Sequence, residues 1–182
     1  MSRPRRASLV HRFRQDHRGV ALVEFALIFP MLVALYFGGF EVCNMTATYR
    51  KLTDTTVEVA NVTAQYPTMA AADVTAVFAA TSQIMAPYAT SNLQIVLSEV
   101  TTDANSAAKV TWSQSYNGAT ALAVGSAVTL PSGLAAPSSN YILVQTTYNY
   151  TPTVGSAFIG RVPMTSSIYI IPRNSPSIPY TG

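Results

Sequence analysis

The sequence is poor in the residues on which most enzymes and metal sites depend. It has one cysteine, Cys43, and two histidines, His11 and His17, both at the N-terminal end. A single cysteine excludes an intramolecular disulfide and a cysteine-based metal cluster, and we interpret Cys43 as a small apolar residue. The chain after residue 17 has no imidazole for general-base catalysis or metal binding. We therefore expect no enzyme, no metal and no cofactor.

Charge is also scarce, and most of the positive charge lies at one end. Charged residues make up 10% of the chain, against 49% hydrophobic residues. Six of the eleven basic residues but only one of the eight acidic residues precede Gly19, so the remainder has five basic and seven acidic residues. Such a remainder lacks the basic surface of a nucleic-acid-binding protein, and we expect no nucleic-acid partner. No phosphate-binding loop or nucleophile-elbow motif is present, so we also expect no small-molecule substrate.

One long apolar run follows this basic leader. Residues 20–40 read VALVEFALIFPMLVALYFGGF, with Glu24 as the only charged residue. About 20 apolar residues suffice for a helix to cross a bilayer. The run is longer than the apolar core of a secretory signal peptide and has no small-x-small cleavage site after it. It therefore predicts a membrane anchor, and the arginines before it predict a cytoplasmic N-terminus.

The spacing of apolar residues predicts that this helix continues beyond the membrane. Seven residues recur three and four positions apart, as on one face of a helix: Val42, Met45, Tyr49, Leu52, Thr56, Val59 and Thr63. We expect one helix from about Val20 to Ala64, its outer part docked on a sheet. Pro30 removes a helical hydrogen bond, which predicts a kink or local unwinding there.

The rest of the chain predicts a second helix followed by strands. The helix is expected over Ala71–Met85, and the strands over 93–100, 109–116, 141–150 and 162–171, with a short strand over 124–130 inside a Gly/Ala/Ser/Pro-rich stretch. Alternation places Val110 and Trp112 on one face of their strand, and Ile142, Val144, Tyr148 and Tyr150 on one face of theirs. Pro172, Pro176 and Pro179 predict an extended tail.

Together these elements predict an α+β fold: a long N-terminal transmembrane helix that continues into a periplasmic domain, where a second helix packs on an antiparallel sheet. The expected division is a basic leader over residues 1–19, the long helix over 20–66 with its membrane span at about 20–40, and a periplasmic domain with a proline-rich tail over 67–182.

Glu24 is the unusual residue of the membrane segment, and it has two interpretations. In a plain signal anchor it is a carboxylate near the membrane surface that is neutral or reaches the headgroups. If the chain were instead cut between Gly19 and Val20, Val20 would carry a new α-amine one helical turn from Glu24. Pairing with that cation, within the chain or from a neighbouring subunit, would make a carboxylate tolerable in lipid. Such pairing suits an assembly of bundled helices.

The stretch Arg18-Gly19-Val20-Ala21-Leu22-Val23-Glu24-Phe25 resembles the processing site of type IV-like prepilins, with glycine before the cut and glutamate at the fifth mature position. With Pro30 and the segment Tyr36-Phe37-Gly38-Gly39-Phe40-Glu41, it is similar to the TadE-like family of pseudopilins. Residues 142–152, ILVQTTYNYTP, and the strand that closes on Ile171-Pro172-Arg173 are similar to the terminal strands of that family.

This resemblance implies a minor pilin or assembly component of a Tad (Flp) pilus, cut by a membrane-embedded prepilin peptidase and acting in adhesion or biofilm formation. Gly19 and Val20 would form the processing site, and Glu24 and Phe25 would serve assembly and processing. The partners would be the inner membrane, the peptidase, other pilins or pseudopilins and the Tad secretion machinery. The alternative is an uncleaved, permanently anchored single-pass protein with a periplasmic binding domain.

Overall fold

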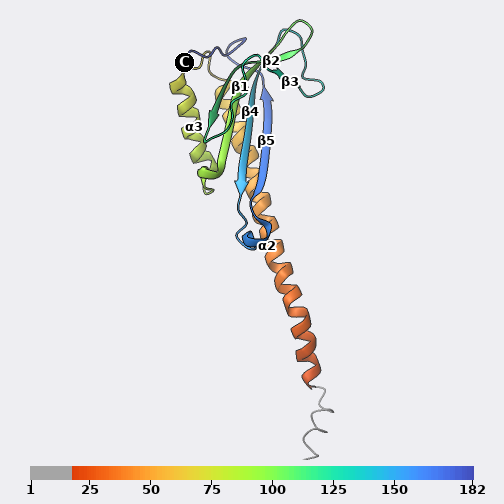
Figure 1. Ribbon diagram of the computed structural model, residues 1–182. Coiled ribbons are helices and arrows are strands. Elements are labelled where there is room, and N and C mark those ends of the chain that lie inside the picture. The colour runs from red at the N-terminus through yellow and green to blue at the C-terminus, as the bar shows by residue number, and fades with distance from the viewer. Residues whose placement is uncertain (1–17) are drawn as a thin grey trace, which may run out of the picture. The chain divides into compact units, whose positions relative to one another are not determined.

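The computed structural model describes residues 18–182. The predicted basic leader therefore lies, up to His17, outside the described residues. The chain forms two compact units, which divide between Cys43 and Asn44. The first unit contains the N-terminal half of one long helix, and the second contains the remaining helices and the sheet (Figure 1).

Helix α2 extends from Arg18 to Thr63 without a break, close to the bounds that the sequence predicts. It contains Pro30 and remains helical on both sides of it, so local unwinding does not occur at this proline. The kink stays a prediction. The helix ends where Gln65, Tyr66 and Pro67 follow, because proline fixes its own backbone and disfavours a helical conformation in the residue before it.

The second unit is a two-layer α+β domain, which confirms the predicted fold class. Its sheet has five strands in the order β3-β2-β1-β4-β5, and every neighbouring pair is antiparallel. The elements after α2 are α3 (Ala71–Met85), η1 (Thr90–Asn92), β1 (Leu93–Thr102), β2 (Ala108–Tyr116), β3 (Ala127–Val128), β4 (Asn140–Tyr150), α4 (Ser156–Ile159) and β5 (Val162–Ile170). Strand β3 is the short strand expected in the Gly/Ala-rich stretch, and it is shorter than predicted.

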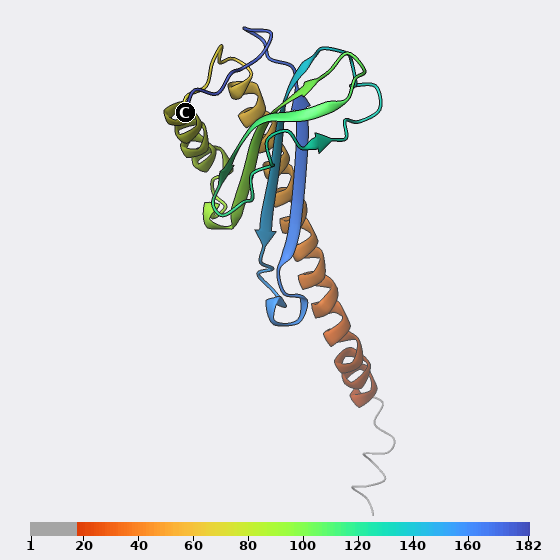
Figure 2. The same cartoon turned by 45° about the horizontal axis from the view of Figure 1, so that its top comes forward.

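The main core lies between one face of the sheet and the two helices α2 and α3 (Figures 1 and 2). Leu52 and Val59 come from α2, and Val77 and Phe78 come from α3. The sheet contributes residues from four strands and the tail contributes one, and all of them are buried: Leu93, Ile95, Leu97, Trp112, Ile142, Val144, Tyr148, Tyr150, Met164 and Ile178. The face predicted for strand β4 is therefore confirmed.

The buried stripe on α2 differs in part from the predicted one. Leu52, Thr56, Val59 and Thr63 are buried as expected, but Val42 and Tyr49 are 62% and 49% exposed. The predicted spacing repeats every seven residues, and a straight helix drifts by about 20° over each such repeat. The contact face of α2 therefore shifts along the helix, and it includes buried residues that the strict spacing misses: Thr48, Thr55 and Ala60.

Threonine hydroxyls are tolerated on this face because the helix itself accepts their hydrogen bonds. Thr55 Oγ1 donates to the carbonyl of Lys51 at 2.7 Å, and Thr56 Oγ1 donates to that of Leu52 at 2.8 Å. Thr56 Oγ1 also lies 2.6 Å from Thr146 Oγ1 on strand β4. A polar contact thus joins the helix layer to the sheet inside an otherwise apolar core.

The predicted shared face of Val110 and Trp112 is wrong, because a bulge lies between them. Glu99 pairs with Trp112, but Val100 pairs with Val110, so Thr111 is an extra residue on β2. An extra residue moves the following side chains to the opposite face. Trp112 therefore faces the main core, while Val110 shares the other face with Ala108, which belongs to a smaller cluster with Val100 and Leu143.

The proline-rich tail differs from the predicted extended segment, because it bends over residues 173–176 and packs back onto the domain. The N–H of Arg173 donates to the carbonyl of Ala64 at 2.8 Å, just after the end of α2. Further along, Tyr180 forms a parallel bridge with Met69, between α2 and α3. The tail is therefore a structural part of the domain, and its Ile178 is fully buried.

Candidate functional site

The residues that the sequence singles out lie in the first turns of α2. Gly19, Val20, Glu24 and Phe25 are all helical and exposed, with Val20 at 49% and Phe25 at 59%. Phe25 contacts Phe29 one turn further along, with ring centroids 5.3 Å apart. Val20 and Glu24 are four residues apart, so the helix places their side chains one above the other on one face.

The apolar side chains of this half of α2 are exposed all round the helix. Thirteen large residues between 20 and 40 are at least 43% exposed: Val20, Leu22, Val23, Phe25, Leu27, Ile28, Phe29, Met31, Leu32, Leu35, Tyr36, Phe37 and Phe40. Each such side chain gains about 1.5–3 kcal/mol on leaving water. A helix that is apolar all round requires lipid or other helices around it.

Helix α2 has the length and composition to cross a membrane. The candidate span is Gly19–Thr63, whose most apolar 18-residue window has a mean hydropathy of 2.3 and no part buried by the protein. This finding supports a single-pass membrane protein with the span near its N-terminus. Because Glu24 lies in the second turn of this helix, its carboxylate is near one end of the span.

The first unit contains two further residues of interest, Pro30 and Cys43. Pro30 lies within the exposed apolar segment, and its assigned role as a kink stays a prediction. Cys43 is a free, exposed thiol at the end of this unit. Among residues 18–182, no group of three or more histidine, cysteine or acidic side chains is placed to bind a metal ion.

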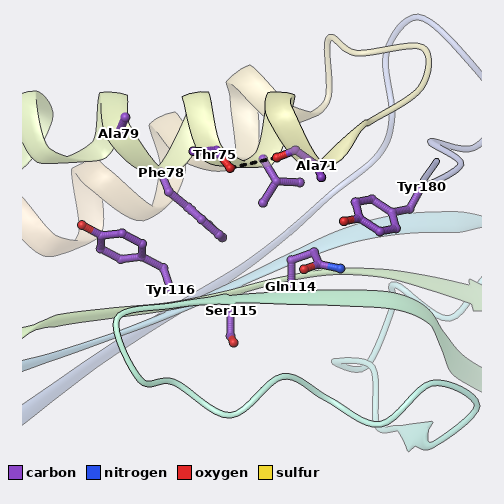
Figure 3. Close-up of a pocket in the computed structure, with 9 residues that line it drawn as sticks. Ala71, Thr75, Phe78, Ala79, Gln114, Ser115, Tyr116 and Tyr180 are labelled. Carbon is purple, nitrogen blue, oxygen red and sulfur yellow. Dashed lines mark hydrogen bonds between the residues drawn. The ribbon is translucent and has the colours of Figure 1, made fainter. Parts of the chain in front are cut away.

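In the second unit a hollow lies between α3 and strand β2. It has a volume of about 420 Å³ and is lined by Phe78 and Thr75 from α3, Gln114 and Tyr116 from β2, and Tyr180 from the tail, among others (Figure 3). Phe78 and Tyr116 pack together with centroids 5.3 Å apart. Its lining contains neither a charged residue nor histidine.

The sequence reasoning missed one residue of clear chemical interest, Glu99. Its side chain is 1% exposed, and its Oε1 accepts a hydrogen bond of 2.7 Å from the backbone N–H of Ile178. No motif and no cluster of acidic residues in the sequence singles out Glu99. Strand periodicity could have found it, because Leu93, Ile95 and Leu97 alternate with more polar neighbours and Glu99 continues their face.

The comparisons with known proteins connect the first of these regions to a family. Residues 19–61 match the family model described as TadE-like protein. Comparison with curated proteins and with solved structures returned no match. The matched residues begin at Gly19 and cover nearly the whole of α2, including all the exposed large apolar residues between 20 and 40. The chain is therefore similar to TadE-like proteins over its long N-terminal helix, and this match supports a Tad pilus-related protein.

Proposed function

We propose that this chain is a structural pseudopilin of a Tad (Flp) pilus, which is processed by a prepilin peptidase and supports pilus assembly, adhesion and biofilm formation. One observation carries the proposal: the TadE-like match coincides with a helix whose apolar surface is exposed on all sides. Such a surface suits a subunit that resides in the inner membrane and then packs against the helices of its neighbours.

In this proposal the first turns of α2 perform the steps specific to a pilin. The peptidase cuts between Gly19 and Val20, and Phe25 forms part of the motif that it recognises. Val20 then carries the new α-amine, and Glu24 pairs with this amine or with that of a neighbouring subunit. Because the pair forms in apolar surroundings, it sets the register between neighbouring helices as they assemble.

The proposed topology follows from the charge distribution. The arginine-rich leader stays in the cytoplasm, α2 spans the inner membrane, and the α+β domain faces the periplasm. The proposed partners are other pilins or pseudopilins and the Tad secretion machinery. We propose no catalytic activity, because the body of the chain carries neither histidine nor a catalytic motif.

The mature N-terminus tests this proposal directly. In cells that make the pilus machinery, mass spectrometry of the purified protein is expected to find Val20 as the first residue. Replacement of Gly19 by a bulkier residue is expected to leave the leader attached, with membrane insertion unchanged. A chain that keeps its leader in every molecule while the peptidase is active would instead support the permanently anchored protein with a periplasmic binding domain.

A further inference from the structure

The C-terminal tail is held on the domain by contacts at its two ends and by one buried side chain in between. At one end, the N–H of Arg173 donates to the carbonyl of Ala64. At the other end, Met69 N–H donates to the carbonyl of Pro179, and Thr181 N–H donates to the carbonyl of Met69, both at 2.9 Å. These bonds tie the tail to the segment between α2 and α3. We refer to residues 172–181 as the strap.

The middle of the strap is held by two hydrogen bonds to the backbone of Ile178. The N–H of Ile178 donates to Glu99 Oε1, and its carbonyl accepts from Trp112 Nε1, each at 2.7 Å. Glu99 and Trp112 are cross-strand partners on β1 and β2, so the sheet presents one acceptor and one donor to the same residue. The ring of Tyr180 also packs on Trp112, with centroids 5.7 Å apart.

Most of the strap lies at the surface, where side-chain hydrogen bonds add to its attachment: Arg173 donates to Asn61, Asn174 to the carbonyl of Gln65, and Asn140 to the carbonyl of Pro176. The only buried residues of the strap are Pro172 and Ile178, and five of the other eight are exposed: Arg173, Asn174, Pro176, Pro179 and Thr181. None of residues 172–181 lies in a strand. Segments with few buried contacts open at a lower free energy than the core to which they are attached.

Burial of the Glu99 carboxylate under such a segment is energetically unfavourable, because the charged group loses its hydration. Burial raises the pKa of the Glu99 carboxyl group, and the hydrogen bonds from Ile178 and Trp112 oppose that rise only in part. The side chains that face it across the sheet are those of Trp112 and Ile142, and neither carries a charge. A closed strap therefore places an acid in surroundings with no cation to compensate for its charge.

No charged group on the neighbouring elements takes that role within the described chain. Asp73, the only charged residue of α3, accepts a hydrogen bond from its own helix start at Ala70. Strands β4 and β5 carry no charged residue, and the strap itself adds the titratable Tyr180 and the exposed Arg173, whose guanidinium donates to Asn61 Oδ1 on α2. The charged side chains on β2 and the outer part of α2 are exposed or half-buried: Lys109, Arg50, Lys51, Asp54 and Glu58.

We propose that the strap opens and closes as a unit over Glu99 and Trp112, and that closing is linked to uptake of a proton by Glu99. With the strap open, Glu99 lies near water and ionises as an ordinary glutamate. With the strap closed, the buried carboxyl group holds its proton more tightly. Proton linkage then favours the closed strap at low pH.

The sign follows from the two protonation equilibria. Because the pKa of Glu99 is higher in the closed state, the closed state is favoured below the ordinary glutamate pKa. As the pH rises from about 4.3 to the raised value, the closed state loses stability by up to about tenfold per pH unit. Above the raised value the loss is complete and no further change occurs.

The intact chain in detergent allows two measurements of this opening. Trp112 is the only tryptophan, so its fluorescence reports on the strap without labelling. As the pH rises, its emission is expected to shift to the red. The amide protection factors of Met69, Ile178 and Thr181, corrected for intrinsic exchange, are expected to fall together by up to about tenfold per pH unit. Amides of β1 and β4 are expected to stay protected.

Two matched variants separate Glu99 from general effects of pH. Glu99→Gln keeps an acceptor for Ile178 but cannot titrate, so it is expected to keep Trp112 buried and to abolish the pH dependence. Glu58→Gln removes an exposed carboxylate of α2 and is expected to behave like the wild type. Ile178→Ala, which leaves Glu99 in place, is expected to lower strap protection at every pH while the sheet stays protected.

The proposal fails if Glu99→Gln keeps the wild-type pH dependence. It also fails if the strap amides exchange only together with those of β1 and β4, because the strap would then not open as a separate unit. If Glu99→Gln does not fold, the wild-type exchange profile and the Ile178→Ala variant decide between these outcomes. None of these measurements depends on cleavage of the leader, so they test the strap independently of the pilin function.

Discussion

Two glutamates of this chain lie in apolar surroundings and present different problems. Glu24 is exposed on a helix that carries thirteen exposed large apolar side chains between residues 20 and 40. Glu99 is inside the domain, where it accepts a backbone hydrogen bond from the strap. Glu99 has partners within its own chain, whereas the described structure gives Glu24 an exposed position on the membrane helix. A role in assembly therefore suits Glu24, and a role within the domain suits Glu99.

Replacement of Glu24 tests this assignment. Glu24→Ala is expected to leave membrane insertion intact, since it makes the helix more apolar. It is expected to lower incorporation into the pilus or its assembly complex by at least about tenfold, because an unpaired charge in lipid costs several kcal/mol and the partner amine would lose its counter-charge. Quantitative immunoblotting of sheared pili and of co-purified membrane partners measures both effects.

The matched control for this experiment is Glu58→Ala, which removes an exposed carboxylate from the outer part of the same helix. It is expected to incorporate like the wild type. Normal pilus levels and normal co-purification in Glu24→Ala would contradict the proposal that Glu24 sets the register between neighbouring helices.

At the scale of single elements, the two halves of the continuous helix α2 have different surfaces. Its first half exposes apolar residues on all sides, and its second half buries only one face. That face combines aliphatic residues with threonines that donate to the helix backbone. The sequence pattern identified the helix and its approximate end, but the contact face depends on the angle at which α2 crosses the sheet.

Tyr49 and Leu52 both belong to the predicted stripe, and their burial distinguishes the observed contact face of α2 from the predicted one. Leu52 is fully buried, so Leu52→Ala is expected to lower the free energy of unfolding by about 2–5 kcal/mol. Tyr49 is 49% exposed, so Tyr49→Ala is expected to change it by no more than about 0.5 kcal/mol. Chemical denaturation monitored by Trp112 fluorescence measures both, and equal costs would contradict the observed face.

At the scale of the whole molecule, the second unit carries its own core. The residues of the main core lie between positions 52 and 178, all after the division at Asn44. The outer part of α2 covers one face of the sheet together with α3. A fragment that starts at Asn44 therefore retains every buried residue of that core.

The fragment Asn44–Gly182 is accordingly expected to fold without membrane or detergent and to unfold in one cooperative transition. The physical reason is that most of the exposed large apolar residues lie in the first unit, while the second has a buried core of its own. Circular dichroism and Trp112 fluorescence during urea denaturation measure this. Aggregation of the fragment, or non-coincident transitions, would show that the first unit is needed for folding.

The sequence alone predicted the long apolar helix, the order and type of most elements, and the resemblance to the TadE-like family. These features depend on local patterns: an apolar run of membrane length, periods of two and of three to four residues, and proline at the ends of elements. The bulge at Thr111 and the helix face that includes Thr55 lay beyond such patterns, because each depends on how separate elements pair or cross.

The opening residues of α2 are, in sequence and in structure alike, Gly19, Val20 and, one turn later, Glu24 on an exposed apolar helix. The tertiary structure decided the tail and Glu99. No local pattern places Ile178 against a strand 79 residues earlier, because that contact forms only when the sheet and both helices are already assembled. The physical reason is that hydrophobic periodicity is a property of a segment, whereas burial of a carboxylate is a property of everything that surrounds it.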